Sequence, residues 1–355
     1  MRRPGLDAAL VETARAAGAE VRERSRVTGL LRDGNGRVTG VTWSGRDGSS
    51  GEINAKLVVG ADGRRSGVAR MVGARMHHQW DNRRMMAYAY FRDPREELRH
   101  IAMQWRQDAE LVTIFPCDGD QSVVLLMSPV GRAAEYRADS VATFESTVAS
   151  IPPLRDRLVG CTRESNVLIS YEHPAFFRHS TGPGWALVGD AGHFKDPVTA
   201  SGIRDALRFG RLLGEAAAPT LDHPTRLFLA LTRWEHERDR ECLPMYQWAN
   251  ALGLDDAVSP IEAAAYKWFA ADPYGPSEIL QVFSRARLPE EVFTPSRVVR
   301  WVGQALREPG AKKADVWRTV RRDVGREAAR RKEAALFSRK RAASEERLFG
   351  PDFRV

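Results

Sequence analysis

Hydrophobic and polar positions along the chain predict strands that run directly into helices. Apolar residues fill positions 185–188, which predicts a short buried strand, and Gly189 and Asp190 end it. Beyond a loop, apolar residues recur at helical spacing as far as Leu213, so we expect a helix there. Residues 56–59 predict a second strand, which also ends in a Gly and an Asp shortly before a predicted helix. The same order of strand, acidic turn and helix therefore occurs twice.

The N-terminal segment predicts a helix, a strand and a hairpin. Apolar spacing predicts the helix over residues 6–17, and residues 19–27 predict the strand. Strand-like runs over 28–32 and 37–44 flank the turn sequence DGNG, which favours a β-hairpin at this point.

Between the two acidic turns the pattern is typical of β-structure. Short runs of β-forming residues, separated by turn sequences, predict a β-rich region from Met85 to Ser128. A helix is predicted over 141–151, a strand over 167–171 and a loop over 173–184. Beyond the second acidic turn we expect mostly helices, over residues 225–245, 260–269, 276–286, 295–306 and 312–346.

The composition of the 355-residue chain is that of an ordinary globular protein, with 43% hydrophobic and 28% charged residues. No run approaches the roughly 18 apolar residues of a membrane span, and the N-terminus lacks the apolar core of a signal peptide. Cys117, Cys161 and Cys242 are widely spaced and odd in number, which argues for a reducing compartment and against disulfides or a zinc site. We therefore expect a cytoplasmic protein without a bound metal.

The net charge of +8 is concentrated at the C-terminal end. Residues 311–355 contain 14 Lys and Arg against 7 Asp and Glu, whereas the other 310 residues contain 40 against 39. The body of the protein is therefore nearly neutral, which disfavours nucleic-acid binding as its main role. The basic tail is most simply a solvated helix, and a contact with a nucleotide or an acidic partner is the alternative.

Each acidic turn has residues suited to a phosphorylated ligand that also carries hydroxyl groups. The carboxylates of Asp62 and Asp190 can accept hydrogen bonds from sugar or ribityl hydroxyls. The helix N-terminus after each turn favours an anion, and Arg64 and Arg70 add positive charge beside Asp62. The alternative for Asp62 is a purely structural role, as a helix cap or in an Asx-turn.

The residues of the two turns resemble those of a known family. The first motif consists of Asp62, Gly63, Ser66 and Arg70. Residues 189–197 have the pattern GDAxHxxxP, and an Arg-x-x-Leu sequence begins at Arg3. Together these motifs resemble the flavin-dependent monooxygenases of the p-hydroxybenzoate hydroxylase type. The resemblance extends over residues 3–217.

The resemblance implies an α/β fold with an FAD/NAD(P)-binding Rossmann-like three-layer domain, an antiparallel β-sheet substrate domain and a helical C-terminal region. Residues 1–75 and 165–250 would form the FAD-binding domain, residues 76–164 the substrate domain, and residues 251–355 the helical region with the basic tail. The GxGxxG loop that binds the ADP half of FAD in such domains does not occur in the sequence. The chain begins at a point that the family reaches only after this unit. We therefore expect a shortened form or a variant, with an exposed sheet edge.

The resemblance also implies which residues contact FAD. They are Arg3, Asp62, Gly63, Arg64, Ser66, Arg70, Gly189, Asp190, Ala191, Pro197, Ser201, Gly202 and Ile203. The sequence departs from the family at Ala200, where a glycine is common, and at Arg204, where an asparagine is common. A solvated arginine is the alternative for Arg3, and His193 is expected to be a hydrogen-bonded structural residue. No side chain is assigned as a catalytic acid or base.

The expected substrate is a small molecule. Met103, Trp105 and Phe115 either line its cavity or belong to the core of the β-rich region. The implied function is that of an FAD-dependent oxidoreductase, above all a monooxygenase that uses NAD(P)H and O₂ on an aromatic or conjugated compound. Flavin-dependent reductases of isoprenoid double bonds and flavin-dependent halogenases share the motifs and are the alternatives. From another class, the alternative is a non-catalytic remnant or partner-binding module. The oligomeric state is left open.

Overall fold

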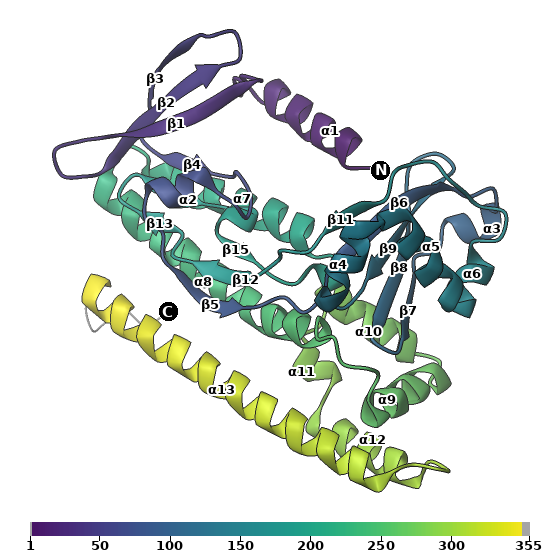
Figure 1. Cartoon of the computed structure of the whole chain (residues 1–355). Coiled ribbons are helices and arrows are strands. Elements are labelled where there is room, and N and C mark those ends of the chain that lie inside the picture. Colours follow the sequence, from purple (N-terminus) through teal and green to yellow (C-terminus); the bar gives the residue numbers. More distant parts are fainter. Residues whose placement is uncertain (1, 350–355) are drawn as a thin grey trace.

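The computed structural model describes the backbone of residues 2–349 and the side chains of residues 2–336 (Figure 1). Helix α1 (Arg3–Ala16) opens the chain, with a proline in its first turn, where no backbone N–H is needed. Gly18 follows the helix with a φ of +92°, which lets the chain turn away. No residue of α1 is buried, so this helix lies on the surface.

A three-stranded antiparallel sheet follows α1. Its strands are β1 (Ser25–Arg32), β2 (Val38–Gly45) and β3 (Ser50–Asn54). The predicted hairpin at the DGNG turn is confirmed by the pairing of β1 with β2. The prediction of a strand over residues 19–24 is wrong, because this stretch alternates charges without an apolar face and Arg24 has a left-handed φ of +56°.

The two acidic turns lie side by side at the end of a parallel strand pair. Strand β4 (Val58–Gly60) pairs in parallel with β14 (Trp185–Leu187), and β13 (Thr181–Gly182) pairs with the other side of β14. Helices α2 (Gly67–Met71) and α7 (Gly202–Ala217) follow the two turns. Because parallel strands end at the same edge of a sheet, both predicted motifs point toward one region of the molecule.

The segment just before β14 is a strand where a loop was expected. All four residues of β12 (Ala175–Arg178) are buried, and β12 pairs with β5 (Met76–Trp80) and with β15 (His193–Phe194). The apolar pattern does not reveal this strand because it is short and lies between a proline and a Gly-Pro-Gly turn. The buried Arg178 is stabilised there by hydrogen bonds to backbone carbonyls.

The predicted β-rich region is confirmed as an antiparallel sheet. Its strands are β6 (Met86–Arg92), β7 (Met103–Gln107), β8 (Glu110–Pro116), β9 (Gln121–Met127), β10 (Thr162–Arg163) and β11 (Leu168–Ser170). One face packs in an apolar cluster with the helical segment of α4 (Ala133–Ala138), α5 (Ser140–Ser150) and α6 (Pro152–Arg157). Helix α3 (Glu96–Arg99) connects β6 to β7.

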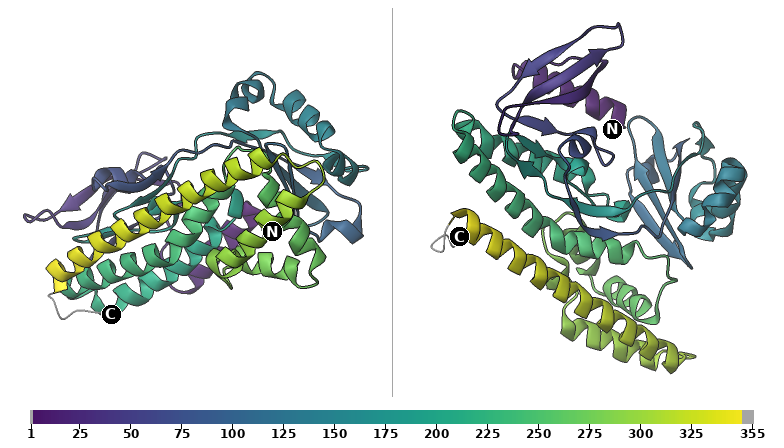
Figure 2. Two further views of the ribbon diagram at one scale, coloured as in Figure 1. Left: turned by 90° about the horizontal axis from the view of Figure 1, so that it is seen from below. Right: turned by 60° about the vertical axis from the view of Figure 1, so that its left-hand side comes forward.

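The predicted C-terminal helices are confirmed. They are α8 (Pro224–Leu252), α9 (Pro260–Ala271), α10 (Gly275–Phe283), α12 (Pro295–Arg307) and α13 (Lys313–Phe349). The short helix α11 (Pro289–Val292), between α10 and α12, is not predicted by the pattern. Helix α8 packs on α7, and the long α13 lies along α8 and α12 in both views of Figure 2. No helix among the described residues is long and apolar enough to cross a membrane.

The parallel sheet has an open edge, as the sequence predicts. Its strand order is β13-β14-β4, so one side of β4 has no strand partner among the described residues. Val59, in the middle of β4, is 41% exposed. The exposed apolar residues Ile203 and Leu207 lie one turn apart at the start of α7.

Candidate functional site: two acidic turns

In the first acidic turn, the carboxylate accepts hydrogen bonds from the start of the helix that follows it. Both carboxylate oxygens of Asp62 accept hydrogen bonds, from Ser66 Oγ at 2.5 Å and from the backbone N–H groups of Gly67 at 2.6 Å and Val68 at 3.1 Å. Ser66 is the N-cap of α2 and accepts from the N–H of Ala69 at 2.9 Å. Burial acts to raise the pKa of Asp62, but these hydrogen bonds lower it overall. Asp62 therefore has the capping geometry that the sequence allowed as its structural alternative.

In the second acidic turn, the carboxylate is open, that is, without a hydrogen-bond donor among the described residues. Asp190 lies in the short turn η2 (Gly189–Ala191), and no described residue donates a hydrogen bond to its carboxylate. One carboxylate oxygen lies 3.9 Å from the point where a Cβ on Gly202 would sit, so Asp190 faces the first turn of α7. No N-cap side chain satisfies that end of α7. Burial raises the pKa of Asp190, and the charges of Lys195, Arg64 and Arg3 oppose this rise.

Arg178 joins the two turns, a role that the sequence does not predict. Its guanidinium donates to the carbonyl oxygens of Ala191 at 2.9 Å and Arg64 at 3.1 Å, one in each turn. It also lies over the ring of Phe176, at 4.2 Å from the ring centroid. No sequence signal marks this role, because its partners are backbone atoms of distant segments.

The other residues predicted to contact the cofactor near the first turn, and Arg3, make contacts within the protein or with solvent. Gly63 has a φ of +77° and closes the turn through the hydrogen bond from Ser66 N–H to its carbonyl oxygen. Arg64 donates to the backbone oxygen of Glu172, and Arg70 is exposed on α2. Arg3 is 65% exposed and pairs with Asp7 one helical turn away, and its charge also acts on Asp190.

The loop before α7 is tightly built. Pro197 begins the turn η3 (Pro197–Thr199), which Asp196 caps through the N–H of Val198 at 3.0 Å. Ala200 has a left-handed φ of +51°, a conformation that glycine adopts without strain. Ser201 turns its hydroxyl inward to Thr199, while Ile203 is 43% exposed. The alanine at position 200, where the family commonly has a glycine, is therefore accommodated in a left-handed backbone conformation.

A group of three residues near this loop has the right atoms for a metal ion but the wrong surroundings. Side-chain atoms of His193, Asp205 and Cys242 lie within 4.8 Å of one another, and all three residues are buried. Asp205, however, already contacts Lys195 and Arg285. Burial also raises the pKa of the Cys242 thiol to about 12, so the metal-binding thiolate is disfavoured. This arrangement is an ion-pair cluster.

The three candidate substrate residues lie on two faces of the antiparallel sheet. Gln104 donates to Thr113 Oγ1 on one face, so Met103 and Trp105 occupy the opposite, helix-covered face. Trp105 packs against the apolar core on that face. Phe115 shares the face of Thr113, because side chains alternate along β8.

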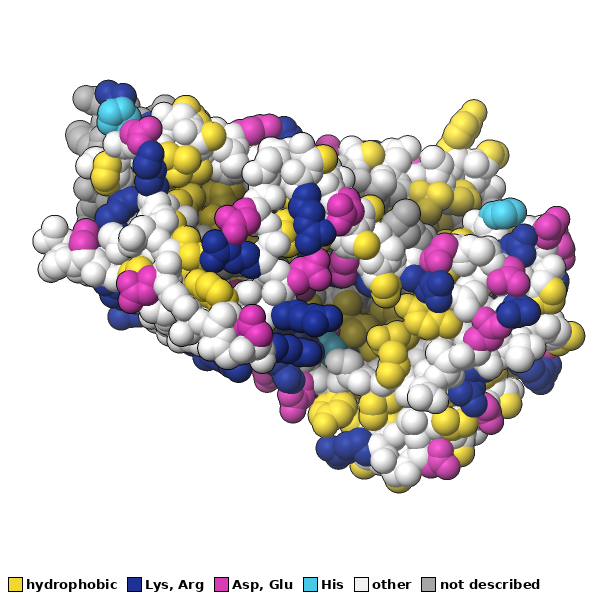
Figure 3. Space-filling view, turned by 90° about the horizontal axis from the view of Figure 1, so that it is seen from above, with side chains coloured by type: hydrophobic (Ala, Val, Ile, Leu, Met, Phe, Trp, Pro, Cys, Tyr) yellow, Lys and Arg dark blue, Asp and Glu magenta, His cyan; other side chains and the backbone are white. Residues whose placement is uncertain are grey.

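The face that carries Phe115 meets the loop before α7. Leu111 and Met127 of this face pack against Val198 of the loop. Tyr88 and Tyr90 of β6 occupy the same face, with ring centroids 6.4 Å apart, and both are partly exposed. The alternation of alanine and tyrosine over residues 87–90 is the sequence signal that could have placed both tyrosines on one face of the sheet. Viewed from above, the molecule is hollowed near its middle, with hydrophobic side chains in the floor and Lys and Arg on one rim (Figure 3).

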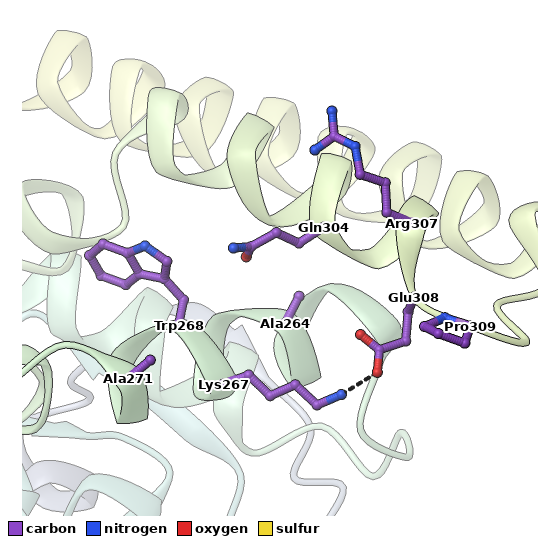
Figure 4. Close-up of a pocket in the computed structure, with 8 residues that line it drawn as sticks. All are labelled: Ala264, Lys267, Trp268, Ala271, Gln304, Arg307, Glu308 and Pro309. Atoms are coloured by element: carbon purple, nitrogen blue, oxygen red, sulfur yellow. Dashed lines mark hydrogen bonds and ion pairs between the residues drawn. The ribbon is translucent and has the colours of Figure 1, made fainter.

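Two cavities lie elsewhere. One of about 340 Å³ lies between α9 and α12, where Lys267 pairs with Glu308 at its edge (Figure 4). Another of about 440 Å³ lies between α7 and α8 and is lined in part by Arg208 and Glu241. Asp62 and Asp190 line neither of them.

The Asp190 turn fits the ribityl end of a flavin. It offers a half-buried carboxylate without a hydrogen-bond donor, next to a helix N-terminus that no side chain caps. Gly189 has a φ of +55°, and a Cβ there would lie 3.4 Å from Ala206, so the turn packs directly on α7. The Asp62 carboxylate, by contrast, already accepts three hydrogen bonds, from Ser66, Gly67 and Val68.

Curated relatives of this chain share between a quarter and a third of their aligned residues with it. Digeranylgeranylglycerophospholipid reductase of Methanocella arvoryzae is 29% identical over 237 residues, which cover 65% of this chain and 57% of that protein. The first such reductase of Methanopyrus kandleri is 30% identical over 256 residues, which cover 70% of this chain and 65% of that protein. The chain thus spans less than two thirds of the length of these relatives.

Solved structures share the fold. Flavin-dependent brominase Bmp2 superposes with a TM-score of 0.70 at 15% identity, over 92% of this chain and 76% of that one. The flavin-dependent halogenase CmlS superposes with a TM-score of 0.62 at 21% identity, over 84% and 51% of the two chains. The family described as FAD binding domain matches residues 3–221, which include both acidic turns. The chain therefore belongs to the FAD binding domain family.

Proposed function

We propose that the chain acts as an FAD-dependent oxidoreductase on an apolar, conjugated small molecule. The observation that carries this proposal is the open Asp190 carboxylate at the first turn of α7, whose preceding loop packs against the aromatic face of the sheet. A polar cofactor end and an apolar wall thus adjoin, which is the arrangement that a flavin and a hydrophobic substrate require.

Each part of the site has a definite role in this proposal. Asp190 accepts hydrogen bonds from ribityl hydroxyls, and the N-terminus of α7 stabilises negative charge on the flavin ring. Arg178 fixes the two turns relative to each other. Tyr88, Tyr90 and Phe115 form the wall for the substrate. FAD supplies the redox chemistry, and these side chains bind, orient and exclude water.

The leading reaction is monooxygenation with NAD(P)H as the electron donor and O₂ as the oxygen source. Aromatic side chains on the wall favour a flat or conjugated substrate, because ring faces stack on such molecules. A flavin-dependent reductase is the second candidate. It is favoured by the curated relatives at 29% and 30% identity, which are named as reductases of a geranylgeranyl lipid.

One series of measurements tests these candidates. The purified chain is titrated with FAD while flavin fluorescence and the visible spectrum are recorded, and the expected result is a saturable complex with flavin bands. NADH and NADPH are then added with a panel of phenols and polyenes. Substrate-stimulated O₂ uptake with an oxygenated product supports the monooxygenase, whereas double-bond reduction without O₂ uptake supports the reductase. Halide-dependent product would indicate a halogenase.

The contrary result of that titration is equally clear. A chain that is folded by circular dichroism, but that shows no flavin bands once free FAD has been removed, is not an FAD-dependent enzyme by itself. That outcome would support the non-catalytic or partner-binding alternative.

A further inference from the structure

Charged side chains from distant segments converge on the first turn of α7. Asp205 stands on this turn and is 2% exposed. Lys195 comes from the loop after β15, Arg285 from the turn after α10, and His193 from β15 itself. Arg285 lies 80 residues beyond Asp205 in the sequence, in the C-terminal helical region.

Asp205 is the hub of this cluster. Arg285 Nη2 donates to both carboxylate oxygens, at 3.0 and 2.9 Å, and Lys195 Nζ contacts one of them. His193 Nε2 lies 3.5 Å from the same oxygen, and Arg204 Nη1 lies 3.1 Å from the other. The side chains of Lys195 and Arg285 are only 5% and 3% exposed. One buried carboxylate therefore holds two buried cations.

The cluster lies beside Asp190, because Asp205 stands on the turn of α7 that one Asp190 oxygen faces, 3.9 Å from the Cβ position of Gly202. Among the charges that oppose the effect of burial on the pKa of Asp190, that of Lys195 is the largest, ahead of Arg64 and Arg3. Asp205 acts on Asp190 in the opposite sense, as a like charge. The charge of Lys195 thus acts on Asp190 while its Nζ contacts Asp205. Arg285 supplies a second cation to Asp205.

We propose that Lys195 and Arg285 are positioning residues of the cofactor site, which connect the C-terminal helical region to the turn of α7 that Asp190 faces. Both cations hold Asp205, and with it the first turn of α7, in place opposite the open carboxylate. This inference rests on the proposed function for its cofactor, but the ordering of the 189–205 segment depends on the cluster alone.

Loss of Arg285 would redistribute the charges around Asp205. Asp205 would keep Lys195 and the partly exposed Arg204 as its cations, but it would lose the contact of a buried guanidinium with both of its oxygens. The loop and the first turn of α7 would also lose the contact that ties them to the turn after α10.

The first measurement needs no cofactor. Arg285→Met and Lys195→Met are compared with the parent chain by hydrogen exchange of backbone amides in the 189–205 segment. The matched control is Lys267→Met, which removes a lysine from the exposed ion pair with Glu308. We expect exchange about tenfold faster in this segment for both test variants, and unchanged exchange in the control and in β8 and β9. Unchanged exchange in the test variants would overturn the proposal.

The second measurement links the cluster to FAD. The dissociation constant for FAD, from flavin fluorescence, is expected to rise about tenfold in both test variants and to stay constant in Lys267→Met. Faster exchange with an unchanged dissociation constant would overturn the link to the cofactor. A parent chain that does not bind FAD would contradict the proposed function, while the exchange comparison would still decide the role of the cluster.

A conservative variant covers the case in which Arg285→Met does not fold. Arg285→Lys keeps one buried cation beside Asp205 but loses the second contact of the guanidinium. We expect exchange and FAD affinity between those of the parent chain and of Lys195→Met. Values equal to those of Lys195→Met would show that charge at position 285 is irrelevant, and would overturn its assigned role.

Discussion

The two acidic turns share the order of strand, glycine and aspartate, but their carboxylates have different surroundings. In the first, Asp62 is followed within five residues by α2, and its carboxylate accepts hydrogen bonds from the start of that helix. In the second, α7 begins twelve residues after Asp190, beyond β15 and η3, and the carboxylate remains open. The distance between the acid and the helix start therefore separates a carboxylate that its own helix engages from one that has no hydrogen-bond donor among the described residues.

The intervening loop also changes the electrostatics. The short first turn leaves Asp62 surrounded by hydrogen-bond donors, which lower its pKa overall. The long second loop places Lys195 and Asp196 between the acid and the helix, and it brings in Arg285 through Asp205. Asp190 thus depends on charges from other segments, whereas Asp62 depends on its own neighbours. Four changes test this difference, from the largest expected effect to the smallest.

Asp190→Ala removes the open carboxylate and is expected to have the largest effect on FAD binding. A hydrogen bond from a neutral donor to a carboxylate contributes about 1.5–3 kcal/mol, so the dissociation constant for FAD should rise by roughly ten- to a hundredfold. The free energy of unfolding should change little, because no described residue donates to this carboxylate. Fluorescence titration and urea unfolding measure the two quantities. An unchanged FAD affinity would refute the assignment of Asp190.

Asp62→Ala should show the reverse pattern. Loss of the hydrogen bonds from the N–H groups of Gly67 and Val68 leaves two donors at the start of α2 without an acceptor, although the Ser66 cap remains, and it costs about 1–2 kcal/mol of stability. Urea unfolding measures this loss, and Asp62→Asn, which keeps an acceptor, should recover part of it. FAD affinity should change less than threefold, in the range expected for a surface effect of about 0.5 kcal/mol. A larger loss of affinity than in Asp190→Ala would reverse the comparison.

His193 makes the second turn sensitive to acid. Burial lowers its pKa from 6.5 to about 3, although Asp205 acts in the opposite direction. The unfolded chain takes up this proton near pH 6.5 and the folded chain does not, so stability falls as the pH drops below 6.5. Between pH 7 and 5 this contribution is about 1–2 kcal/mol, from about 1.4 kcal/mol per pH unit. His193→Gln should lose that part of the pH dependence in urea unfolding, and an identical pH profile would contradict it.

Ala200→Gly should give the smallest effect, a stabilisation. The backbone at Ala200 is left-handed, with a φ of +51°, and glycine adopts this conformation without a Cβ clash. The gain is about 0.5–1 kcal/mol, reduced by the greater freedom of glycine in the unfolded chain. Differential scanning calorimetry would show it as a small rise in Tm. A fall in Tm would indicate that the side chain of Ala200 makes packing contacts that outweigh the strain.

Local features of the site could be predicted from the sequence, and non-local ones could not. The strands before Gly60 and Gly189 and the helices after them are predicted by apolar runs and spacing. Whether Asp62 caps its helix or binds a ligand depends on loop geometry, which the pattern leaves open. Met103 and Trp105 illustrate a second limit, because the face they occupy depends on pairing register and on which face the helices cover.

Contacts between residues distant in the sequence could not be predicted for the same reason. Arg178 binds two backbone carbonyls, which carry no sequence signal. Arg285 meets Asp205 across 80 residues, and a lone arginine after a helix predicts only a solvated surface. The strand β12 was not predicted because pairing with β5 and β15, more than its own four residues, stabilises it.

The most direct test compares the two acids in one experiment. FAD is titrated into Asp190→Ala and Asp62→Ala under identical conditions, and the ratio of their dissociation constants is measured by flavin fluorescence. If the open turn binds the flavin and the closed turn is structural, the Asp190→Ala constant should be at least about tenfold larger, from about 1.4 kcal/mol of lost binding energy. Equal constants, or a larger constant for Asp62→Ala, would contradict this division of roles.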